Sequence, residues 1–208
     1  WWNIYRYLDG RIETVTSDLT EYGEPHWVFS QQSYDFFDDG TIIAKGKSKG
    51  TDTLVVIDPE NKKQRAVESE LTSFSYVNLD ANGDIFCIGA SEKRVGCAVR
   101  ICLADGSMEV LRKASSIILK EISQARWISY PGEEGESFGY LSLPKNRNYT
   151  LPEDEKPPLL VMAHGGPTAQ SSGVVSLVKQ FFTSAGFAII DVDYHGSTGY
   201  GRKYRDSL

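Results

Sequence analysis

Cysteine is scarce in this sequence, and that scarcity limits the chemistry open to it. The 208 residues include only three cysteines, Cys87, Cys97 and Cys102. An odd number cannot form a complete set of disulfides within the chain, and the three share no spacing typical of metal ligands. We therefore expect buried free thiols in a reducing, cytoplasmic compartment, and no metal site.

Long apolar runs and excess positive charge are also missing. No apolar stretch approaches the roughly 18 residues that span a bilayer. The formal net charge of -6 argues against nucleic acid or an anionic membrane as the main partner. No signal peptide is recognisable, and the chain begins with Trp1 and Trp2 rather than Met, so we expect a piece of a longer protein.

What the chain does have is a globular composition that divides into two parts. It is 40% hydrophobic and 12% aromatic, which is typical of a packed fold and not of disorder. Up to about residue 121 it reads as short strands and turns, such as "GTIIAKG", "DTLVVIDPENK" and "GDIFCIGA". No apolar pattern with a 3.6-residue period is sustained there, so we predict that residues 1–121 are all β.

The strand-and-turn units of this first part recur at regular intervals. The turn glycines of "DDGTIIA" and "ANGDIFCI" are Gly40 and Gly83, and 83 − 40 = 43. The turn aspartates Asp9, Asp58 and Asp105 are separated by 58 − 9 = 49 and 105 − 58 = 47 residues. Such periods are typical of the blades of a β-propeller, and two or three blades fit, fewer than a closed propeller needs. An ordinary β-sandwich with regular hairpins is the alternative.

Residues 122–208 have a different pattern of apolar and polar residues. "ARWISYPG" and "SFGYLSLP" predict a hairpin, and a polar, proline-rich loop follows. "LLVMA" is a continuous apolar run, which predicts a strand covered on both faces. "VVSLVKQFFTSAG" predicts an amphipathic helix that Gly186 ends, and "FAIIDVDY" predicts another buried strand. A strand, a helix and a strand form the βαβ unit of a mostly parallel sheet, which binds ligands at the carboxyl ends of its strands.

The loop after "LLVMA" carries the clearest chemical signal. Its residues are His164, Gly165, Gly166 and Pro167. Two adjacent glycines allow backbone N–H groups to point into a cleft, as in the oxyanion hole of α/β-hydrolases. His164 would support the loop by hydrogen bonds, and Pro167 would stiffen its exit. A tight turn without function is the alternative.

No serine in the chain fits a nucleophile. "GESFG" matches G-x-S-x-G at Ser137, but a strand ended by Pro144 follows it where a nucleophile elbow needs a helix. Ser197 lacks the first glycine of that motif, and His26, His164 and His195 do not allow the order serine, acid, histidine. Asp191 and Asp193 end a strand, and we expect them to be structural.

Taken together, these segments resemble the prolyl oligopeptidase family of serine peptidases, in particular its acylaminoacyl-peptidase and dipeptidyl-peptidase-like branch. The resemblance rests on "PPLLVMAHGGPTAQSS", "SAGFAIIDVDYHGSTGYGRKYRDSL" and "PHWVFSQQSYDFFDDGTIIA". It implies C-terminal propeller blades over residues 1–121 and the start of an α/β-hydrolase catalytic domain over 122–208, with the triad beyond Leu208. It also implies that Gly166 donates an oxyanion N–H, that Gly165 gives it room, and that a further loop lines the active-site side. That loop consists of Gly196, Ser197, Thr198, Gly199, Tyr200 and Gly201.

The function implied for the full-length protein is hydrolysis of short peptides through an acyl-enzyme, without metal or cofactor. These 208 residues alone are expected to be inactive, because the nucleophile is absent. Two alternatives remain open: an esterase on the same scaffold, and a binding module that has lost catalysis. One departure from the family is His195, where relatives often carry Arg or Gly. The sequence gives no prediction of oligomeric state.

Overall fold

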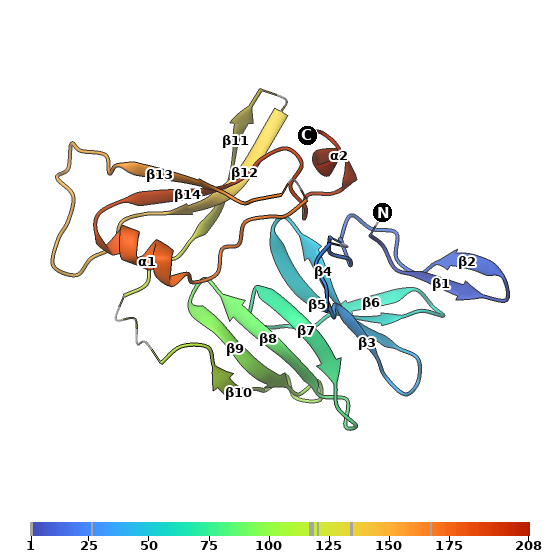
Figure 1. The fold of residues 1–208 in the computed structure, drawn as a ribbon. Helices are drawn as coiled ribbons and strands as arrows, with labels where there is room; N and C mark the ends of the chain where they lie inside the picture. Colours follow the sequence, from blue (N-terminus) through green and yellow to red (C-terminus); the bar gives the residue numbers. More distant parts are fainter. Residues whose placement is uncertain (1, 26, 117–118, 120, 134, 167) are drawn as a thin grey trace.

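The protein consists of antiparallel meanders followed by one mixed sheet. The computed structural model describes all residues except 1, 26, 117, 118, 120, 134 and 167 (Figure 1). Among the described residues, strands form four sheets, and helices are few. The first and smallest sheet is the hairpin of β1 (Tyr5–Leu8) and β2 (Arg11–Thr14).

Two four-stranded meanders follow the hairpin, and their strands repeat at nearly constant spacing. Strand β4 begins at residue 42 and β8 at residue 85, and 85 − 42 = 43. The turn before each carries a glycine with positive φ, Gly40 (84°) and Gly83 (82°), so the predicted repeat is confirmed. No closed propeller is present within the described residues. The strands are β3 (Tyr34–Phe36), β4 (Ile42–Ser48), β5 (Thr51–Asp58), β6 (Lys63–Ala66), β7 (Ser73–Leu79), β8 (Ile85–Ser91), β9 (Arg94–Ile101) and β10 (Met108–Lys113).

One apolar core joins the two meanders. Ile43 and Leu54 of one sheet pack in the same cluster as Val77 and Ile85 of the other, and all four are fully buried. Alternating side chains of these strands point to one face, so each sheet buries one side against its neighbour. The cysteine prediction holds in part. All three thiols are free, and Cys87 and Cys97 are buried, but Cys102 is partly exposed.

The C-terminal sheet has the order β11-β12-β14-β13. Strand β11 (Arg126–Gly132) and strand β12 (Gly135–Ser142) form the predicted hairpin. Strand β13 (Leu159–Ala163) runs parallel to β14 (Ala188–Asp193), with helix α1 (Leu177–Ser184) between them in the chain. The predicted strand-helix-strand unit is therefore present. A one-turn helix, α2 (Arg202–Arg205), lies close to the C-terminus.

The prediction that "LLVMA" is covered on both faces is wrong for the described residues. Strand β13 is an edge strand that pairs only with β14, and Leu159 and Val161 are exposed. Helix α1 leaves Val178 and Phe181 exposed as well. A continuous apolar run makes a strand suitable for burial, but burial also requires neighbouring segments, and none of the described residues covers this edge.

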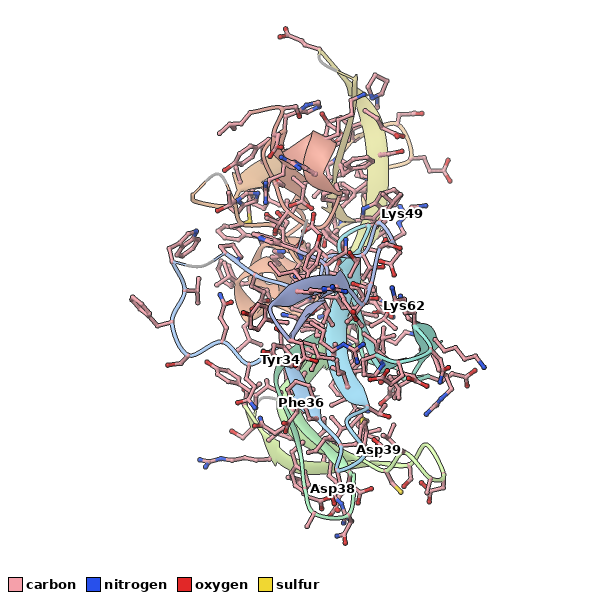
Figure 2. The ribbon with its side chains drawn as sticks, turned by 90° about the vertical axis from the view of Figure 1, so that its right-hand side faces the viewer. Tyr34, Phe36, Asp38, Asp39, Lys49 and Lys62 are labelled. Atoms are coloured by element: carbon pink, nitrogen blue, oxygen red, sulfur yellow. The ribbon has the colours of Figure 1, made fainter. Side chains whose placement is uncertain are left out.

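The C-terminal sheet and the segment before α1 contact the ends of strands in the N-terminal meanders. The turn between β4 and β5 has positive φ at Lys49 and Gly50, as two-residue hairpins prefer. The Tyr140 hydroxyl donates to the Gly50 carbonyl at 2.8 Å, and Val175 N–H donates to the Ser91 carbonyl at 3.0 Å. In Figure 2, Lys49 lies at the end of its sheet nearer the C-terminal sheet, and Asp39 lies at the opposite end.

Candidate active site

The two loops that leave the carboxyl ends of β13 and β14 contact each other. The parallel register sets Ala163 opposite Val192, so both loops begin at the same edge of the sheet. His164 Nε2 lies 2.8 Å from Ser197 Oγ, and the His164 ring stacks on Tyr194 with centroids 4.5 Å apart. The structure thus brings together the histidine predicted to support one loop and a residue of the other.

The loop of residues 164–166 has exposed glycines and restrained carbonyls. The Tyr194 hydroxyl lies 3.1 Å from the His164 carbonyl oxygen and 3.2 Å from that of Gly166. Because a trans peptide sets N–H opposite C=O, the Gly165 N–H points away from Tyr194. Among the described residues, neither glycine amide donates a hydrogen bond, and Gly166 has a φ of +69°. Pro167, predicted to stiffen the exit, lies outside the described residues.

A buried carboxylate lies beneath both loops. Asp193 is fully buried and accepts hydrogen bonds from Ser171 N–H at 2.5 Å and from the Tyr200 hydroxyl at 2.6 Å. Burial raises the pKa of Asp193, and the hydrogen bonds and nearby His164 oppose that rise only in part. Neighbouring Asp191 forms an ion pair with Lys179 of α1. Both aspartates therefore hold the sheet, its loops and the helix together.

His164, Ser197 and Asp193 are close together but do not form a catalytic triad. In a triad, one ring nitrogen of the histidine contacts the serine and the other contacts the carboxylate. Here the same atom, His164 Nε2, lies 2.8 Å from Ser197 Oγ and 3.8 Å from Asp193 Oδ1. Ser197 is also fully buried, so a substrate could not reach its hydroxyl. The cluster fixes the two loops to each other.

The loop of residues 196–201 forms hydrogen bonds with several other segments of the chain. Thr198 N–H donates to the Ala169 carbonyl at 3.0 Å. Tyr200 stacks on Phe138 with centroids 4.4 Å apart, while its hydroxyl reaches Asp193. The backbone amides of Gly199 and Gly201 donate to the carboxylate of Glu21, which comes from the N-terminal half of the chain.

A tryptophan from the N-terminal half also reaches the site. Trp27 Nε1 donates to Thr168 Oγ1 at 3.1 Å, and its ring lies 3.8 Å from where a Cβ on Gly166 would stand. Sequence reasoning missed both Trp27 and Glu21, since their partners lie more than 140 residues away. For Trp27 the only local signal is an aromatic cluster in a polar loop, and a lone glutamate gives none.

Ser137 and His195, which were also considered from the sequence, have structural roles. Ser137 lies within β12 opposite Tyr130, so it is in a strand interior and not at a strand-to-helix turn. The His195 ring packs on Tyr204, and its Nδ1 lies 2.8 Å from Ser207 Oγ. His26 lies outside the described residues.

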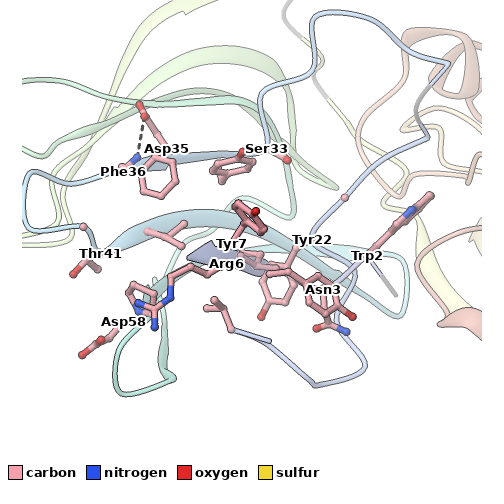
Figure 3. A pocket seen from close by; sticks show the side chains of 18 of the residues that line it. Trp2, Asn3, Arg6, Tyr7, Tyr22, Ser33, Asp35, Phe36, Thr41 and Asp58 are labelled. Carbon is pink, nitrogen blue, oxygen red and sulfur yellow. Dashed lines mark hydrogen bonds between the residues drawn. The ribbon is translucent and has the colours of Figure 1, made fainter. Parts of the chain in front are cut away.

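A large cleft lies away from these loops. It has a volume of about 1290 Å³ and lies between the β1–β2 hairpin and the sheet that begins with β3. In Figure 3, Arg6 and Tyr7 of the hairpin face Asp35 and Phe36 across it. Its lining, among the described residues, carries the hydroxyls of Ser33 and Thr41 but no histidine or cysteine.

Neither a metal site nor a membrane-spanning helix is found in the described part of the chain. No group of three or more histidine, cysteine or acidic side chains there could hold a metal ion. The described helices are all too short or too polar to cross a membrane.

The known proteins that this chain resembles in sequence and in structure are peptidases. No family model matches the sequence. Dipeptidyl aminopeptidase BIII of Pseudoxanthomonas mexicana is 33% identical over 70 residues, which are 33% of this chain and 10% of that protein. The acylamino-acid-releasing enzyme of Sus scrofa is 33% identical over 85 residues, 41% of this chain and 11% of that protein.

A solved structure matches over the whole chain. The puromycin-hydrolyzing peptidase of Mycobacterium tuberculosis superposes with a TM-score of 0.90 at 30% identity. The match covers 100% of this chain and 33% of that one. The chain therefore spans about a third of the length of this solved relative.

Proposed function

The resemblance of this chain to the prolyl oligopeptidase family of serine peptidases is confirmed by its relatives, and from it we propose that the chain is part of a serine peptidase. The full-length protein hydrolyses short peptides by acylating a serine and then hydrolysing the acyl-enzyme. Residues 1–121 contribute blades of a β-propeller, and residues 122–208 begin an α/β-hydrolase domain. The nucleophile, acid and base lie outside these 208 residues.

The observation that carries this proposal is the state of the two glycines at the end of β13. Gly165 and Gly166 are exposed, and the Tyr194 hydroxyl lies within hydrogen-bond distance of the carbonyl oxygens of His164 and Gly166. Amides held in this way are preorganised to receive the negative charge that develops on a carbonyl oxygen during acyl transfer. Gly166 donates one such hydrogen bond, Gly165 leaves room for the substrate, and His164 holds the loop through Ser197.

The test is a pair of alanine substitutions in the full-length protein. Gly166→Ala adds a Cβ where φ is +69°, which strains the backbone and turns the amide. We expect kcat/KM on an acyl-peptide to fall by roughly a hundredfold to a thousandfold, which is what one oxyanion donor contributes. Gly10→Ala is the matched control, because it adds a Cβ at a similar φ of +79° in the turn between β1 and β2, away from both loops, and that Cβ would meet no atom within 4 Å. We expect a much smaller change there.

Two results would count against the proposal. Equal kcat/KM for the Gly166→Ala variant and the wild type would remove Gly166 from the oxyanion hole. Turnover of simple esters without any turnover of acyl-peptides would replace the peptidase with an esterase on the same scaffold.

A further inference from the structure

Glu21 is a buried acidic residue of the N-terminal half whose carboxylate serves the C-terminal half. Its backbone pairs with Lys47 of β4, with Glu21 N–H donating to the Lys47 carbonyl and the reverse bond also made, both at 2.9 Å. Its side chain leaves this bridge and reaches the loop of residues 196–201. The carboxylate accepts from Gly199 N–H at 2.7 Å and from Gly201 N–H at 3.1 Å, and the residue is 2% exposed.

The two amides are the main polar partners of this carboxylate. Burial raises the pKa of Glu21, and the hydrogen bonds from Gly199 and Gly201 are the largest opposing effects. Lys47 and Arg205 are the charged groups that face it, and they act more weakly. Lys47 also forms an ion pair with Asp52 at 3.2 Å. Burying a carboxylate that has no ion-pair partner of its own costs free energy. Losing its hydrogen bonds to the loop therefore destabilises the protein more than losing the same bonds at an exposed carboxylate.

The backbone of the loop is shaped to present both amides to one carboxylate. Gly199 and Gly201 have φ of +90° and +85°, which other residues rarely adopt. A Cβ on Gly199 would collide with the side chain of Gln170. Between the two glycines, the side chain of Tyr200 turns toward Asp193. The glycines therefore allow the backbone to face Glu21 while the tyrosine faces the C-terminal sheet.

We propose that Glu21 is a positioning residue that anchors the loop of residues 196–201 from the N-terminal half of the protein. The anchored loop keeps Ser197 against His164, and His164 begins the loop whose glycine amides face the substrate. The anchoring follows from the hydrogen bonds alone, whereas its effect on catalysis rests on the proposed function.

Hydrogen exchange in the full-length protein tests the anchor without requiring activity. In Glu21→Ala, we expect exchange in a peptide covering residues 196–201 to accelerate by about tenfold to a hundredfold, as expected when hydrogen bonds to a charged acceptor are lost. Glu21→Gln keeps one acceptor oxygen in a side chain of equal size, so we expect an intermediate effect. Glu24→Gln is the matched control, because it removes a carboxylate that pairs with buried Lys45 and, among the described residues, forms no hydrogen bond or ion pair with the loop.

Two outcomes would overturn the anchor: unchanged loop exchange in both Glu21 variants, or equal acceleration in the Glu24 control. Peptidase kinetics then test its consequence, with kcat/KM expected to fall in the order wild type, Glu21→Gln, Glu21→Ala. A loosened loop with unchanged kcat/KM would reject the positioning role. A wild-type protein that hydrolyses no acyl-peptide would instead reject the proposed function, while the exchange result would still decide the anchor.

Discussion

At the scale of single residues, Asp193 links the two candidate loops to the sheet beneath them. It is fully buried, and its carboxylate receives hydrogen bonds from Ser171 and Tyr200. These bonds favour the charged form, but burial disfavours it more, and the pKa is raised above its ordinary value of 3.8. The folded protein therefore binds a proton at Asp193 more readily than the unfolded chain does.

This shift predicts how stability depends on pH. Between pH 3.8 and the raised pKa of Asp193, the folded state holds more protons at this site than the unfolded state, so its stability falls as pH rises. Asp193→Asn cannot titrate. We expect the free energy of unfolding of the wild type, relative to this variant, to decrease as pH rises through that window and then to level off. Urea unfolding at a series of pH values measures the difference.

Asp206→Asn provides a control of opposite sign. Hydrogen bonds from Arg205 and Arg202 lower the pKa of Asp206. Its contribution to stability is present above the unfolded pKa and is lost as pH falls through the folded one. Parallel pH curves for the wild type and the Asp193→Asn variant would contradict the assignment of Asp193.

How far the candidate site could be predicted depends on the range of its contacts. His164, Gly165 and Gly166 stand out in the sequence because adjacent glycines after an apolar strand form a local pattern. The contact between Glu21 and Gly199 joins residues 178 positions apart, and that between Trp27 and Thr168 joins residues 141 apart. No local pattern encodes such pairs, because the fold of the intervening chain brings them together.

At the scale of elements, the edge strand β13 and helix α1 present apolar surface. Val161 is 67% exposed and Phe181 is 66% exposed. Among the described residues no strand pairs with the outer edge of β13, and such edges pair with other chains. The sequence predicts the strand correctly through its continuous apolar run and the helix through its amphipathic period. It does not predict their exposure, which depends on what packs against them.

This edge predicts self-association of the 208-residue polypeptide. Val161→Lys places a charge on the exposed face of β13, and we expect light scattering at equal protein concentration to drop several-fold. Leu111→Lys is the matched control on β10, another edge strand, where the 47% exposed leucine already lies beside Arg112 and Lys113. If both variants reduced scattering equally, a general effect of charge would explain the result and β13 would not be the contact.

At the scale of the whole molecule, the two meanders that the sequence repeat encodes share one apolar core. The 43-residue step that separates Gly40 from Gly83 also separates the starts of β4 and β8. Each meander alone has one apolar face that needs a partner, and the two faces meet in a single cluster that includes Ile43 and Ile85. Two sheets that complete each other's core should lose stability together.

Alanine substitutions in either sheet test this coupling. Ile43 and Ile85 are both fully buried, and truncating either should lower the free energy of unfolding by roughly 2–5 kcal/mol. We expect Ile43→Ala to speed hydrogen exchange in β8 and β9 as much as in β4 and β5, with Ile85→Ala giving the same pattern. Ile12→Ala on β2 is the control, since Ile12 is exposed and its loss should change neither sheet. Faster exchange confined to the mutated sheet would mean that each meander is stable on its own, because the cluster would then contribute little across the boundary between them.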